Sequence, residues 1–68
     1  MEWYVLRTTF TRRERSPVRF VKEKHAGPFD SVRDAQAVAK RENALSATRN
    51  VSYVVGTRGD IGVHGIIT

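Results

Sequence analysis

The stretch WYVLRTTFT, residues 3–11, decides the fold, because it is rich in aromatic and β-branched residues. A period of two predicts a β-strand whose side chains point to opposite faces of a sheet. The two faces carry, respectively, Tyr4, Leu6, Thr8 and Phe10, and Trp3, Val5, Arg7 and Thr9. The strand therefore begins with large apolar side chains on both faces.

The sequence on the C-terminal side of this strand predicts a hairpin. Residues 12–17 contain no apolar side chain except Pro17 and are rich in arginine, which is typical of an exposed loop. Residues 18–24 then return as a second strand, which we expect to end before the turn-forming pair Gly27-Pro28.

A helix and a third strand follow. Ser31 and Asp34 form an approximate capping box, which predicts a helix that begins at Val32 and ends near residues 46–48. Its apolar stripe contains Val32, Ala35, Val38, Ala39 and Leu45, and the two small alanines favour close packing on a sheet. Residues 51–55 alternate again as a strand.

These elements predict an α+β fold, with an antiparallel sheet of three or four strands in the order β-β-α-β and one helix on one face. Residues 56–68 contain four glycines, and we leave them open between a flexible tail and a short hairpin that turns at Gly59-Asp60. The 68 residues provide room for one core, so we expect a single domain over 1–68.

Composition narrows the class of protein. The 40% of hydrophobic and 28% of charged residues are typical of a globular domain. No run of apolar residues approaches the roughly 20 that cross a bilayer. We also expect no signal peptide, because residues 1–5 enter a strand-like run without a basic region and a long apolar stretch before it. We therefore expect a cytoplasmic protein without a membrane partner.

The sequence contains no recognisable arrangement for catalysis. Cysteine is absent, and neither His25 nor His64 stands in a context that would activate a nucleophile or complete a metal site. The four glycines of residues 56–65 are not followed in this sequence by the helix that a phosphate-binding loop requires. We expect no enzyme, no catalytic residue, no metal and no cofactor.

Self-association is the first functional hypothesis. One helix can cover only one face of the sheet, so we expect Trp3 and Val5 to lie on the uncovered face and to form the interface of a homodimer at micromolar concentration. The chain also lacks the disulfides and metals that often stabilise small domains, which makes oligomerisation a natural source of stability.

Nucleic-acid binding is the alternative hypothesis, because the net charge of +5 is concentrated in one segment. Between residues 12 and 24 there are six basic and two acidic residues, which leaves +4 of the total charge in the hairpin. Such side chains neutralise phosphates, although they also keep an edge strand soluble. The six candidate binding residues are Arg12, Arg13, Arg15, Arg19, Lys22 and Lys24.

One segment resembles a known family. Gly27-Pro28-Phe29-Asp30-Ser31, a helix with Ala35 and Ala39, and Tyr53-Val54-Val55 resemble the second half of a sporulation-related repeat (SPOR) domain. This resemblance covers about half the chain and implies glycan binding. In overall style the chain is also similar to small uncharacterised proteins of actinobacteria and their bacteriophages, which implies an accessory module that binds an unknown host protein.

Overall fold

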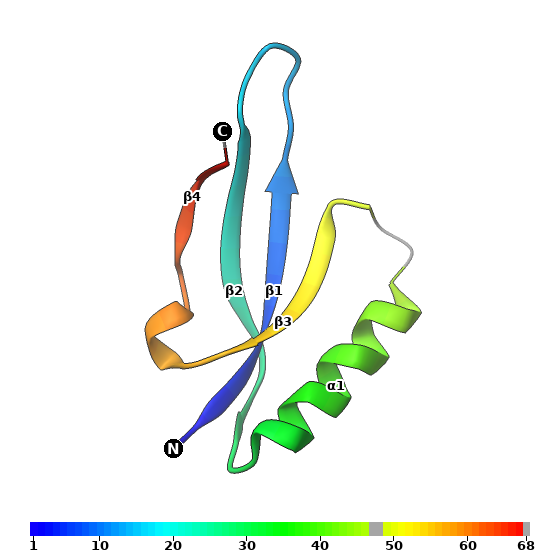
Figure 1. Ribbon diagram of the computed structural model, residues 1–68, viewed down its shortest axis with the longest axis vertical. Helices are drawn as coiled ribbons and strands as arrows, with labels where there is room; N and C mark the ends of the chain where they lie inside the picture. The colour runs from blue at the N-terminus through cyan, green and yellow to red at the C-terminus, as the bar shows by residue number, and fades with distance from the viewer. Residues whose placement is uncertain (47–48, 68) are drawn as a thin grey trace.

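The computed structural model describes residues 1–46 and 49–67, and it contains one antiparallel sheet and one helix (Figure 1). The strands lie in the order β3-β1-β2-β4, so β1 and β2 are central. The expected α+β class, with a helix against an antiparallel sheet, is confirmed. In chain order the elements are β1 (Trp3–Thr11), β2 (Val18–Phe29), α1 (Val32–Leu45), β3 (Val51–Gly56), the 3-10 turn η1 (Arg58–Asp60) and β4 (His64–Ile67).

Helix α1 begins where the sequence predicts. The Ser31 hydroxyl accepts a hydrogen bond from the Arg33 backbone N–H at 3.2 Å, which satisfies one of the free donors of the first turn. Ala35 and Ala39 are buried against Val5 of β1, so the small side chains do bring the helix close to the sheet. The two ends of the predicted apolar stripe do not pack on the sheet, since Val32 and Leu45 are exposed.

The expectation that Trp3 and Val5 form a helix-free interface is wrong. Val5 is fully buried in the cluster that it forms with Ala35 and Ala39, and Trp3 packs against that same cluster. The alternation of β1 was correct, but it does not say which of the two faces the helix covers. The helix-free face is the one with Tyr4, Leu6 and Thr8.

This second face is also buried, because the chain crosses it after β3. Strands β3 and β4 occupy opposite edges of the sheet, and residues 57–63 connect them across its lower end (Figure 1). A Cβ placed on Gly56 would lie 2.6 Å from Leu6 Cδ1 and 2.9 Å from an Asp60 carboxylate oxygen. Leu6, which is fully buried, therefore lies directly under the start of this crossover.

The crossover has its own local hydrogen bonds. The Thr57 backbone N–H donates to Asp60 Oδ2 at 2.8 Å, and this bond lowers the pKa of the Asp60 carboxyl. Residues 60–63 then form a tight turn in which the Val63 N–H donates to the Asp60 carbonyl and Gly62 takes a φ of 82°. The hairpin that turns at Gly59-Asp60, one of the two alternatives left open for residues 56–68, does not form, because β4 pairs with β2 instead of β3.

Strand β2 continues past Lys24 to Phe29, farther than the Gly27-Pro28 pair predicted. The register with β1 shifts on both sides of the Val5–Ala26 pair, so β2 carries extra residues there. Such bulges bend a strand, and β2 curves at its lower end (Figure 1). Within the described residues, no helix has the length and apolar character needed to span a membrane.

The close contact between helix and sheet is tested by enlarging a buried alanine. Ala39→Leu should overpack the core around Val5 and lower the free energy of unfolding by about 1–3 kcal/mol. Lys40→Leu introduces the same side chain at an exposed neighbouring position and should change it little. Urea denaturation of both variants measures the difference, and equal destabilisation would contradict the packing described.

The Asp60 hydrogen bond is tested through pH. The folded-state pKa of Asp60 lies below its ordinary value of 3.8, so between these two pH values the unfolded chain binds more protons than the folded chain. The hydrogen bond to Asp60 therefore stabilises the fold fully above pH 3.8, and this stabilisation is lost as the pH falls through the folded-state pKa. Asp60→Ala should therefore melt below the wild type at pH 7, and the gap should close as the pH falls through the folded pKa. Glu14→Ala, at an exposed loop residue, should show no such pH-dependent gap; an Asp60→Ala gap independent of pH would contradict the assignment.

Candidate nucleic-acid interface

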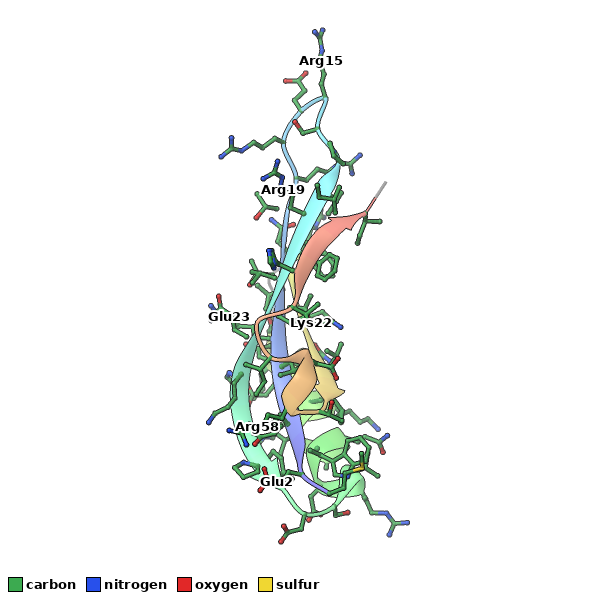
Figure 2. The ribbon with its side chains drawn as sticks, turned by 90° about the vertical axis from the view of Figure 1, so that its left-hand side faces the viewer. Glu2, Arg15, Arg19, Lys22, Glu23 and Arg58 are labelled. Carbon is green, nitrogen blue, oxygen red and sulfur yellow. The ribbon has the colours of Figure 1, made fainter. Side chains whose placement is uncertain are left out.

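The hairpin loop at the far end of the β1–β2 ribbon carries most of the predicted nucleic-acid-binding residues. The ribbon extends well beyond the helix, and Arg15 lies at its tip (Figure 2). Arg15 has a φ of 64°, which turns the chain sharply, and the Ser16 N–H donates to the Arg13 carbonyl at 3.0 Å. All four hairpin arginines, Arg12, Arg13, Arg15 and Arg19, are exposed.

The six predicted residues do not form one surface. Arg19 lies opposite Thr11 on the face of the sheet that also carries Val5, whereas Lys22 lies opposite Thr8 on the other face. Lys24 also lies on that other face, with its Nζ 5.9 Å from the centre of the Tyr4 ring. The structure therefore separates a group of four arginines at the tip, the tip arginines, from two lysines beside the lower core.

A hollow lies at the base of the loop. It has a volume of about 260 Å³ and is lined by Thr11, Arg13, Ser16, Pro17 and Arg19. Two arginines and two hydroxyl-bearing residues line this hollow, and such residues suit a phosphate group, because arginine donates paired hydrogen bonds to phosphate oxygens and hydroxyls add further donors. Sequence reasoning missed Thr11 and Ser16, since their place beside Arg19 depends on the strand register.

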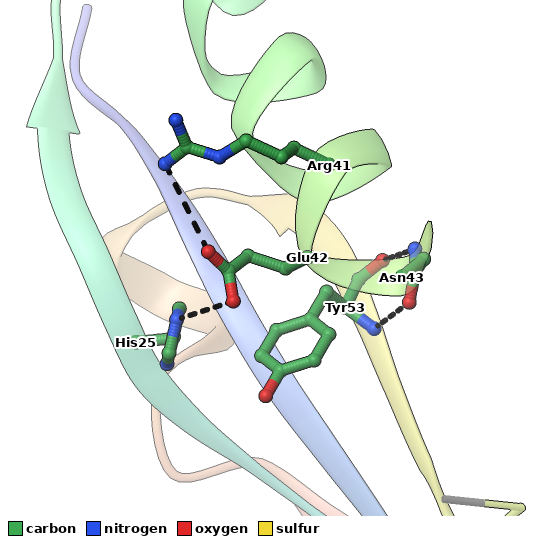
Figure 3. Close-up of polar contacts among 5 residues, drawn as sticks. All are labelled: His25, Arg41, Glu42, Asn43 and Tyr53. Carbon is green, nitrogen blue, oxygen red and sulfur yellow. Dashed lines mark hydrogen bonds and ion pairs between the residues drawn. The ribbon is translucent and has the colours of Figure 1, made fainter. Parts of the chain in front are cut away.

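Nearby carboxylates do not neutralise the tip arginines. Among residues 1–46 and 49–67, the ion pairs within 4 Å are those of Glu42 with His25, at 3.5 Å, and with Arg41, at 3.9 Å. Both lie on the helix side of the lower core, far from the loop (Figures 1 and 3). None of the tip arginines therefore has an ion pair among the described residues, and residues 12–19, which include Glu14, present a net charge of +3 to an outside anion.

The polar cluster around Glu42 joins three elements (Figure 3). Glu42 of α1 contacts His25 of β2, whose ring meets that of Tyr53 of β3 edge-on at 4.8 Å between centroids. These contacts fasten the helix to both strands. Across the described part of the chain, no group of three or more His, Cys, Asp or Glu side chains could hold a metal ion.

The tip arginines with their hollow are therefore the feature with the clearest binding chemistry. Comparison with known proteins adds no relative to this description. No protein-family model matches the sequence, and neither a curated protein nor a solved structure matches it.

Proposed function

We propose that this protein binds nucleic acid through the tip arginines, with backbone phosphate as the group that it recognises. The observation that carries the proposal is the hollow between Arg13 and Arg19, at the base of an exposed loop whose cations have no acidic partner. Electrostatic contacts of this kind supply most of the affinity of sequence-independent binding.

The shape of the site favours duplex over single-stranded nucleic acid. A two-stranded ribbon can enter the major groove, which is about 12 Å wide, and arginines around its tip then face phosphates on both walls. Single strands are held mainly by stacking on exposed aromatic rings. Here Tyr4 is buried in the lower core, and the loop residues 12–17 contain no aromatic ring on which a base could stack.

The hypothesis of a homodimer that forms by way of Trp3 and Val5 loses its structural basis, because Val5 has no exposed surface. The SPOR resemblance implies glycan binding, but the hollow at the loop lies outside the segment of resemblance, residues 27–55. This hollow therefore does not support glycan binding. Phosphate binding at the tip is supported instead by the charge and exposure of the tip arginines and by the hollow beside them.

A salt titration with a labelled duplex tests the proposal. Contacts from four arginines should give a slope of log K against log salt of about −3.6, at about −0.9 for each phosphate contact. Replacing Arg12, Arg13 and Arg15 by alanine should reduce that slope to about −0.9 and leave the circular dichroism unchanged, because an exposed loop contributes little to the core.

The matched control replaces Arg33, Lys40 and Arg41 of α1 by alanine, which lowers the formal charge by the same amount at a site away from the loop. If binding depends on the tip arginines, the control should keep most of the wild-type slope. Equal loss in both triple variants would show that net charge alone matters, and no measurable binding near 0.15 M salt would overturn the proposal.

A further inference from the structure

The two histidines of the chain lie in different surroundings. The His25 ring is 3.5 Å from a carboxylate oxygen of Glu42, in the cluster that fastens the helix to the sheet. His64 is exposed at the start of β4, and among residues 1–46 and 49–67 no carboxylate oxygen lies within 4 Å of its ring nitrogens. His64 is therefore the histidine whose charge, once it is protonated, is available to a ligand.

A second hollow brings His64 together with one of the tip arginines. It has a volume of about 380 Å³ and is lined by Arg19, Phe20, His64, Gly65 and Ile66. Arg19 also lines the hollow at the base of the loop, so the two hollows are neighbours along β2. A chain of phosphates can therefore run from one hollow to the other past Arg19.

The charges that face His64 come from the neighbouring strand, since the other residues of β4 are uncharged. In the pairing of β4 with β2, His64 lies diagonal to Arg19 and Glu23, which share its face of the sheet. Figure 2 shows these two residues on one side of β2 and Lys22 on the other. Glu23 in turn lies opposite Arg7 of β1, so two arginines and one glutamate leave this face with a net charge of +1.

The second hollow suits a sugar-phosphate unit. Arginine donates paired hydrogen bonds to phosphate oxygens, and a protonated imidazole donates from both of its ring nitrogens. Phe20 and Ile66 give the same hollow an apolar wall, against which the carbon atoms of a sugar can pack. The hollow thus matches both the charged and the apolar part of a nucleic-acid backbone.

We propose that the second hollow binds a further phosphate of the same nucleic acid, between Arg19 and protonated His64, so that binding strengthens as the pH falls. This contact rests on the proposed function, because it extends the backbone contacts of the tip arginines by one phosphate. Histidine commonly gains its proton between about pH 8 and pH 5, whereas arginine stays charged across that interval. The number of phosphate contacts therefore depends on pH through His64.

Salt titrations with a labelled duplex at about pH 8 and about pH 5.5 test this contact on the intact chain. At the higher pH the slope of log K against log salt should be about −3.6, from four arginines. At the lower pH it should be about −4.5, because one more contact adds about −0.9. His64→Gln should keep the slope at about −3.6 at both pH values, and His64→Arg should keep it at about −4.5 at both. Circular dichroism at each pH checks that the variants remain folded.

His25→Gln is the matched control, because it makes the same substitution at the histidine that contacts Glu42 and that lines neither hollow. This variant should keep the wild-type dependence on pH. An equal slope at both pH values in the wild-type protein would overturn the proposed contact. So would a pH dependence that survives His64→Gln or is lost in His25→Gln. In these cases binding at about pH 8 leaves the proposed function standing, whereas no binding at either pH overturns both proposals.

Discussion

Two neighbouring residues of β1, Val5 and Leu6, are both fully buried although they point to opposite faces of the sheet. A strand with one solvated face cannot meet that condition, so the chain must cover both sides of its central strand. Helix α1 covers Val5 with two alanines, and the crossover after β3 covers Leu6. The rest of the architecture follows from this double cover.

Covering both faces uses nearly all the chain outside the hairpin. The molecule measures 41 × 26 × 14 Å, and its long axis runs along the ribbon, with the helix and crossover at one end and the loop at the other (Figure 1). Because the crossover leads β4 to the far side of β2, the exposed edge lies between the lower core and the loop. Core, edge and charged loop are thus separate parts of one small sheet.

Local patterns predicted the elements well and their assembly less well. The alternation of residues 3–11 and the cap at Ser31 depend on neighbours in sequence, so the first strand and the start of the helix could be located. Which face the helix covers depends on long-range packing, and two equally apolar faces carry no signal about it. The pairing of β4 with β2 likewise depends on the hydrogen bonds of Lys22 with residues 62 and 63.

The candidate site, too, could be predicted where it depends on local sequence but not where it depends on strand pairing. Composition identified the basic segment, and its exposure followed from the absence of apolar residues in the loop. The alternation within β2 then separates Arg19 from Lys22, and the pairing of Thr11 with Arg19 forms the hollow. Both require the strand register, which the sequence alone leaves open because several registers keep the same residues facing inward.

Binding at the loop can be located by residue-by-residue NMR of the ¹⁵N-labelled protein during titration with a short duplex at low salt. Phosphate binding by the tip arginines predicts amide shift changes concentrated in residues 11–20, with the amides of Val5, Leu6 and the helix nearly unchanged. Shift changes centred on Trp3 or on α1, with the loop unaffected, would contradict it.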